Sequence, residues 1–129
     1  MGNKGYTGLV NYNIKGTGLD ITDELRSYVE RGLAAAGKFM MGDGTAHTNI
    51  ELEHHPIQDG PRYRAEFTAT CGGEVHRAEA RGETLHGAID IASGALAREL
   101  GRDKKKRLHT LRRTAVKVKE YLRGWRRKV

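Results

Sequence analysis

The chain has 129 residues, of which 37% are hydrophobic and 30% charged, values that are ordinary for one soluble domain with a modest core. No apolar run reaches membrane-spanning length, and the N-terminal residues lack the apolar core of a signal peptide. The lone cysteine, Cys71, excludes an internal disulfide, so we expect a cytoplasmic protein.

The formal charge of +7 is unevenly distributed along the chain. From Arg102 onward there are 13 Lys/Arg and only 2 Asp/Glu, whereas the residues before Arg102 carry more acidic than basic side chains. A strongly basic segment behind a near-neutral body favours a polyanion as partner, either nucleic acid or an anionic membrane surface. The alternative is a basic tail that only keeps the protein soluble.

The first predicted strand follows a polar, glycine-containing segment, residues 1–8, which we expect to be a flexible arm. Val10, Tyr12 and Ile14 alternate with polar residues, the pattern of a half-buried strand. Glycines within residues 16–18 end this strand.

A helix is predicted next, because Asp20 or Thr22 can cap its N-terminus. Its apolar positions recur every three or four residues and end near Gly37, with Phe39 folding back onto the core. These positions are Leu25, Tyr28, Val29, Leu33 and Ala36.

Three further strands are predicted over residues 48–53, 62–71 and 74–81. Gly72-Gly73 suits a two-residue hairpin turn between the last two of them. Val75 is out of phase with the apolar positions that follow it, which a bulge would explain.

The second helix begins near Glu83 and carries its own apolar stripe, and past Leu100 it becomes almost wholly basic. Arg98, Arg102 and Lys106 are spaced four apart, so their charges project along one side. The stripe consists of Leu85, Ile89, Ala92, Leu96 and Leu100.

These elements predict an α+β fold of order β-α-β-β-β-α. Strands one and two are expected to be parallel and strands two to four to form a meander, giving a four-stranded mixed sheet. Both helices would cover one face, while the other face, with Arg62 and Arg64, stays solvated.

Residues 108–129 read as a basic amphipathic helix that either continues the second helix or follows a break near residues 101–103. Its apolar stripe could pack on the domain or pair with a second copy, and its basic face could contact RNA or a membrane. We therefore divide the chain into an arm at 1–8, an α+β domain at 9–107 and a basic helical extension at 108–129.

The residues also resemble a known family. The run from Tyr12 to Arg31, the pair Lys38-Phe39, and residues 62–66, 77–80 and 88–100 are together similar to the ribosome hibernation-promoting factors. These proteins are also called ribosome-associated inhibitors or sigma-54 modulation proteins, and the family's fold has the same β-α-β-β-β-α order.

This resemblance implies a protein that binds the small ribosomal subunit and its rRNA where tRNA and mRNA would sit. Such a protein silences ribosomes under stress or in stationary phase, without catalysis or a cofactor. Carried over position by position, the rRNA-binding residues are Arg26, Arg31, Lys38, Arg98, Arg102, Lys104 and Lys106, with Lys105 and Arg107 added by proximity. Additional RNA or partner contacts are expected from Arg62, Arg64, Arg112, Arg113, Lys117, Arg123, Arg126 and Arg127.

The chain departs from the family pattern in two ways. Gly32, Ala95 and Gly101 stand where relatives commonly carry a charged, usually basic, residue. Long members also have a second, dimerising domain, and the segment after Arg107 is too short to form one, so we expect a short form with an unusual basic extension.

A metal or catalytic site is not expected from the sequence. His54 and His55 are adjacent, so their side chains would diverge, and His76 and His86 lie on separate predicted elements. Two classes of function stay open: a ribosome-binding translation inhibitor, and a protein-interaction module that dimerises or binds a partner through its C-terminal helix.

Overall fold

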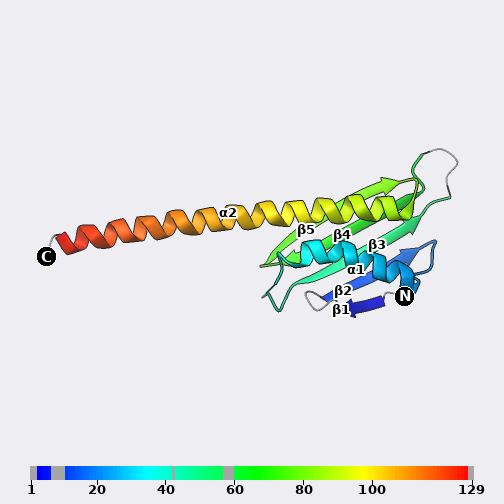
Figure 1. Ribbon diagram of the computed structural model, residues 1–129, viewed down its shortest axis with the longest axis horizontal. Coiled ribbons are helices and arrows are strands. Elements are labelled where there is room, and N and C mark those ends of the chain that lie inside the picture. The colour runs from blue at the N-terminus through cyan, green and yellow to red at the C-terminus, as the bar shows by residue number, and fades with distance from the viewer. Residues whose placement is uncertain (1–2, 7–10, 42, 57–59, 128–129) are drawn as a thin grey trace.

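The computed structural model describes residues 3–6, 11–41, 43–56 and 60–127. A five-stranded sheet forms one layer and two helices form the other (Figure 1). The predicted α+β class and the order β-α-β-β-β-α are confirmed, with one additional strand at the N-terminus. In chain order the elements are β1 (Asn3–Tyr6), β2 (Asn11–Thr17), α1 (Asp23–Gly37), β3 (His47–His54), β4 (Tyr63–Cys71), β5 (Glu74–Gly82) and α2 (Leu85–Arg127).

The strands lie in the sheet in the same order as in the chain, from β1 to β5. β2 and β3 are parallel, because α1 carries the chain back between them, and all other neighbours are antiparallel. This is the mixed sheet that the sequence predicts for β2 to β5.

Strand β1 differs from the flexible arm expected over residues 1–8. Asn3–Tyr6 pair antiparallel with β2, from Asn3 opposite Ile14 to Tyr6 opposite Asn11. The segment shows no apolar alternation, so periodicity could not reveal it; its pairing depends on main-chain groups that any sequence supplies. The other residues of the expected arm, and Val10 of the predicted first strand, lie outside the described residues.

The β4–β5 hairpin has the predicted two-residue turn but no bulge. Gly72 and Gly73 have φ angles of 59° and 78°, the left-handed region that a type I′ turn requires at both positions. Pairing then runs without interruption along both strands. Val75 therefore points to the open face, where it is 66% exposed, and His76 takes the inward position with only 6% exposed.

Helix α1 is capped by Thr22, whose Oγ1 accepts a hydrogen bond of 3.1 Å from the Leu25 amide. The predicted apolar stripe faces the sheet, with Tyr28 only partly buried at its edge. The helix ends at Gly37 as predicted, and Phe39 then packs against the core.

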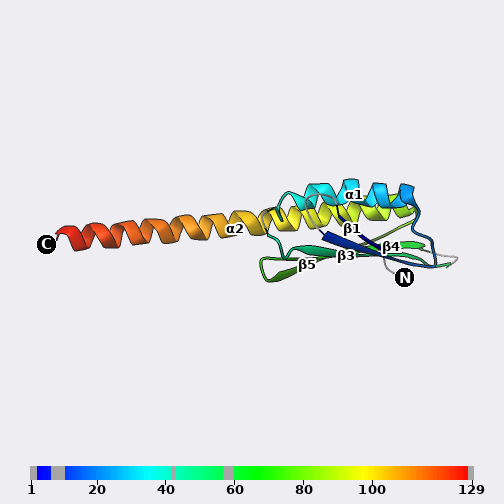
Figure 2. The same ribbon diagram turned by 90° about the horizontal axis from the view of Figure 1, so that it is seen from below.

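Helix α2 is continuous over 43 residues, so the alternative of a break near residues 101–103 is wrong. Its first part lies beside α1 on the same face of the sheet, as the edge-on view shows (Figure 2). Beyond the sheet it projects away from the domain (Figure 1). Among the described residues, no helix is long and apolar enough to cross a membrane.

The core lies between the helix layer and the sheet. Phe67, Ile14 and Ile50 of the sheet and Leu33 and Leu96 of the helices are almost completely buried there. Burial of side chains of this size contributes about 1.5–3 kcal/mol each, which fixes both helices on this face.

Candidate nucleic-acid interface

Helices α1 and α2 run parallel and in close contact. The Tyr28 hydroxyl donates a hydrogen bond of 2.6 Å to Asp90, and Gly32 faces Ser93 one turn further along both helices. At the far end, the ring of Phe39 lies against Gly101. Because the helices are parallel, basic residues near the end of α1 are brought to the part of α2 that becomes cationic.

The predicted α1 cations occupy three different environments. Arg31 is exposed and lies over the Tyr28 ring, 5.5 Å from its centroid. Lys38, at the C-cap, is also exposed, with its Nζ 5.2 Å from the centre of the Phe39 ring. Phe39 in turn contacts Gly101, so Lys38 lies close to the α2 cations.

Arg26 is more enclosed than the other two. It is partly buried beside the Tyr12 hydroxyl, which donates a short hydrogen bond to Glu30. Burial and the Glu30 hydrogen bond raise the pKa of Tyr12, while Arg26 opposes this shift. The Arg26 charge is therefore already engaged by neighbours inside the domain.

The α2 cations form the main positive surface. Arg98 and Arg102 are exposed one turn apart, and Lys104, Lys105 and Lys106 continue the exposed positive charge around the helix. In the described part of the chain, no carboxylate forms an ion pair with any of these five side chains. Their charges are available to an external anion. The Arg107 side chain lies outside the described residues.

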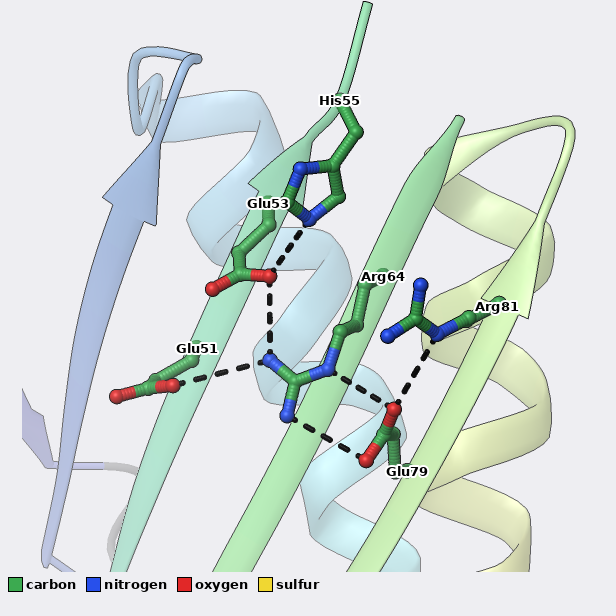
Figure 3. Close-up of a pocket in the computed structure, with 6 residues that line it drawn as sticks. All are labelled: Glu51, Glu53, His55, Arg64, Glu79 and Arg81. Atoms are coloured by element: carbon green, nitrogen blue, oxygen red, sulfur yellow. Dashed lines mark hydrogen bonds and ion pairs between the residues drawn. The ribbon is translucent and has the colours of Figure 1, made fainter. Parts of the chain in front are cut away.

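The open face of the sheet has the opposite character. Arg64 is only 14% exposed and pairs with four glutamates contributed by β3, β4 and β5. Figure 3 shows Glu51 and Glu53 of β3 and Glu79 of β5 around the Arg64 guanidinium. Its guanidinium nitrogens lie 3.8, 3.3, 2.6 and 2.9 Å from the carboxylates of Glu51, Glu53, Glu66 and Glu79, respectively.

The pKa shifts in this cluster follow from the same pairing. The hydrogen bond to Glu79 is the largest influence raising the pKa of Arg64, and the hydrogen bond from Arg64 lowers the pKa of Glu79. The pKa of Glu53 is lowered first by its hydrogen bond with His55. Arg81 also pairs with Glu79, at 3.4 Å. The arginines of this cluster are thus already paired with carboxylates, and Arg64 offers no unpaired charge to RNA.

The remaining predicted contacts are spread over the surface. Arg62 is exposed just before β4, at the end of the sheet where β5 leads into the start of α2. Arg112, Arg113 and Lys117 are exposed on the projecting part of α2. Arg123, Arg126 and Arg127 belong to the helix, but their side chains lie outside the described part of the structure.

Packing explains the small residue at two of the three positions, Gly32, Ala95 and Gly101, where the family resemblance leads us to expect a charged side chain. A Cβ on Gly32 would come within 2.9 Å of the Ser93 hydroxyl, and a Cβ on Gly101 would lie 3.2 Å from the Phe39 ring. The small residues let α1 and its C-terminal extension approach α2 closely. Ala95 is partly buried and packs against the core.

Two features of the surface are not apparent from the linear sequence. The Arg64 cluster depends on strand register, which places Glu51, Glu66 and Glu79 directly opposite one another. A signal was present, since charged residues alternate along all three strands, but their pairing could not be derived from periodicity. Glu99 and Asp103 of α2 also meet Glu74 and His76 of β5, although the two pairs are distant in the chain.

The fold and surface define a two-layer α+β domain whose helix face carries unpaired cations. Comparison with known proteins identifies its family. Residues 12–108 match the model for "Sigma 54 modulation protein / S30EA ribosomal protein", and the chain belongs to this family. The resemblance stated from the sequence is confirmed.

Curated relatives carry the name ribosome hibernation promotion factor. The Bacillus subtilis (strain 168) protein is 27% identical over 97 residues, covering 75% of this chain and 50% of the relative. The protein of Picosynechococcus sp. is 29% identical over 113 residues, covering 84% and 56%. The chain thus spans about half the length of the curated relatives it matches.

Solved structures show the same fold. The N-terminal domain of Thermus thermophilus Protein Y has a TM-score of 0.59 and 30% identity, covering 72% of this chain and 96% of that domain. A ribosomal subunit interface protein from Coxiella burnetii has a TM-score of 0.56 over 73% of this chain and 98% of its own. At 18% identity, the second match supports the fold alone.

Proposed function

We propose that this protein is a ribosome-binding translation inhibitor of the hibernation type. It occupies the tRNA/mRNA region of the small ribosomal subunit and silences cytoplasmic ribosomes under stress or in stationary phase. The observation that supports this function is the contrast between unpaired cations along α2 and neutralised charges on the sheet. Family membership and the names of the relatives supply the ribosome as the polyanion.

The mechanism requires binding and no chemistry. Each Lys or Arg that neutralises a phosphate releases counterions, so several cations on one surface give tight, salt-sensitive binding. Structured RNA is recognised mainly by shape, phosphates and ribose hydroxyls, which suits a rigid helix pair. Inhibition then follows from steric exclusion of tRNA and mRNA.

The main rRNA contacts are assigned to the unpaired cations on the helices. Arg98, Arg102 and Lys106 supply one row, and Lys104 and Lys105 flank it. Lys38 and Arg31 extend the surface onto α1, with Arg26 as a partly enclosed neighbour. Arg107 and the tail cations are included as contacts by their place on α2.

Co-sedimentation with small subunits, large subunits and intact ribosomes across a salt series tests the proposal. We expect binding to small subunits and intact ribosomes, with the logarithm of affinity falling linearly with that of salt concentration. Replacing Arg98 and Arg102 together by Gln should reduce the slope by about 2, since each lost phosphate contact contributes about 1. A translation assay at the same salt should show a matching loss of inhibition.

Two matched controls distinguish the surfaces. The double change of Arg77 and Arg81 to Gln removes two cations from the sheet and should leave the slope unchanged. The double change of Arg112 and Arg113 to Gln measures the contribution of the tail. Absence of binding at low salt, or an equal effect of the sheet variant, would contradict the proposed interface.

A second candidate function is a protein-interaction module. Leu108 and Leu111, which are 45% and 65% exposed on the projecting helix, favour it. Under this alternative, replacing both leucines by Glu would abolish self-association in sedimentation velocity runs or capture of a partner. Under the ribosome proposal, that variant retains small-subunit binding.

A further inference from the structure

A histidine surrounded by three carboxylates lies where β5 begins beneath α2. We call Glu74, His76, Glu99 and Asp103 the His76 cluster. Glu74 and His76 are two residues apart in β5, while Glu99 and Asp103 are four apart on one side of α2. Residues two apart share one face of a strand, and residues four apart share one side of a helix, so the two β5 residues can face the two α2 residues. From the sequence no metal was expected, because the histidines lie on separate predicted elements; the approach of Glu99 and Asp103 of α2 to Glu74 and His76 of β5 appears only in the fold.

The two ring nitrogens of His76 have different surroundings. Nδ1 lies 3.3 Å from a Glu99 oxygen, close enough for an N–H hydrogen bond. Nε2 lies 3.7 Å from a Glu74 oxygen and 3.7 Å from an Asp103 oxygen. Both distances are too long for a hydrogen bond, and Nε2 is buried without a hydrogen-bond partner among the described residues.

When His76 is neutral this arrangement is unfavourable, and a metal cation between the groups would relieve it. A neutral imidazole that donates from Nδ1 to Glu99 directs the Nε2 lone pair at two carboxylates. A buried polar atom without a partner also costs free energy. A metal ion bound by Nε2 and the two carboxylates would remove both penalties.

We propose that His76 Nε2, Glu74 and Asp103 bind a divalent transition-metal ion of the zinc class. One donor atom from each of these three residues lies within 4.8 Å of the other two. Tetrahedral zinc with ligands at about 2.0–2.1 Å requires separations of about 3.3 Å, so small side-chain rotations bring the donors into place. One imidazole and two carboxylates suit zinc, cobalt or nickel, whereas magnesium prefers an all-oxygen octahedron.

Glu99 acts as the positioning residue for the site. By accepting the Nδ1–H of His76, its carboxylate fixes the tautomer in which Nε2 can bind a metal. Three protein ligands leave a fourth position for water. The ion would join β5 to α2 one turn beyond Leu100, where the helix leaves the sheet.

Calorimetric titration of the tag-free, full-length protein with ZnCl₂ after EDTA treatment tests this site. We expect one ion per chain, visible d–d absorption when CoCl₂ replaces ZnCl₂, and no binding of MgCl₂. Zinc should also raise the melting temperature, because a ligand that binds only the folded state stabilises it. These measurements are independent of ribosome binding.

Variants separate the site from the exposed histidines. His76→Gln and Asp103→Asn should each abolish stoichiometric binding, and Glu99→Gln should weaken it by roughly 10–100-fold. His47→Gln and His109→Gln, which change exposed histidines, should leave it intact. Asp103 is on the partly exposed side of the cluster, so Asp103→Asn remains a valid test if His76→Gln does not fold. Absence of zinc binding, or unchanged binding in Asp103→Asn, would overturn the proposal.

Discussion

The two halves of α2 carry the same kind of apolar stripe but have different surroundings. From Leu85 to Leu100 the stripe is covered by the sheet, with α1 alongside, and Leu96 is completely buried. Further along, Leu108 and Leu111 continue the spacing, yet both are exposed. An amphipathic pattern therefore predicts a helix, but it does not establish that a covering surface exists.

The difference also affects how each half is stabilised. The packed half is held by tertiary contacts, whereas the projecting half depends on its own helical propensity, which is marginal for isolated helices in water. Like charges four apart, such as Arg113 and Lys117, oppose helix formation there. A polyanion would remove this repulsion, so the proposed RNA partner would stabilise the projecting half.

Leucine truncation should reveal the largest difference between the halves. Leu96→Ala should lower the free energy of unfolding by about 2–5 kcal/mol, because it leaves a cavity between helix and sheet. Leu111→Ala, at an exposed position, should change it by no more than about 0.5 kcal/mol. Urea unfolding followed by circular dichroism measures both. Equal losses would mean that the projecting half is packed in solution.

Glycine substitution should have a smaller effect that depends on the helix contact. Gly32→Ala places a Cβ 2.9 Å from the Ser93 hydroxyl, so we expect a net loss of about 1–2 kcal/mol despite alanine's better helix propensity. A Cβ on Gly94 would lie 3.7 Å from the Arg98 guanidinium, an ordinary contact, and Gly94→Ala should stabilise by about 0.5–1 kcal/mol. If thermal unfolding shows that both alanine substitutions stabilise the protein, α1 and α2 are not in close contact at Gly32.

Threonine substitutions compare an N-cap position of a helix with a position inside a helix. Thr22 caps the helix that packs beside the first half of α2, so Thr22→Ala should cost about 1 kcal/mol. Thr114 donates a 3.0 Å hydrogen bond to the Thr110 carbonyl within the projecting half. Thr114→Ala should be neutral or slightly stabilising in chemical unfolding. A cost at Thr114 similar to that at Thr22 would contradict this assignment.

The smallest expected effect on stability is that of Asp43, in a loop close to the point where α2 leaves the sheet. Unfolding at acidic pH should detect it. Hydrogen bonds from the Thr45 side chain and the Gly72 and Thr45 amides lower the pKa of Asp43 to about 2. Because the folded-state pKa is depressed, the stabilisation is present above about pH 4 and is lost as pH falls toward 2. The stability gap between wild type and Asp43→Asn in urea should therefore narrow over that interval. A constant gap would exclude this linkage.

Much of the fold could be predicted because local chemistry and tertiary structure agree. Period-two alternation located the strands, the two capping candidates Asp20 and Thr22 located the start of α1, and paired glycines located the β4–β5 turn. Strand β1 could not be predicted, because main-chain pairing at a sheet edge leaves no apolar pattern. The inward position of His76 was not predicted, because a bulge was taken to explain the out-of-phase position of its neighbour Val75.

The candidate interface was only partly predictable. Charge density identified α2, but strand register decides whether a basic residue such as Arg64 is unpaired. The approach of Glu99 and Asp103 to His76 depends on how α2 crosses β5. Tertiary geometry, rather than composition, separates a charge that can bind a partner from one that is already paired.

The continuity of α2 through Gly101 gives the molecule a fixed reach. At 1.5 Å per residue, the helix from Gly101 to Arg127 is about 40 Å long. For comparison, the radius of gyration of a 100-residue domain is about 13 Å, so twice this radius is only about 26 Å. When the proposed RNA partner stabilises the projecting half as a helix, this connection incurs little of the linker entropy that weakens a second contact on a flexible tether. The continuous helix also fixes the direction in which its far side chains point. Deleting two residues beyond Gly101 would rotate the far end of α2 by about 200° about the helix axis relative to the domain, while leaving the composition of both contact regions unchanged.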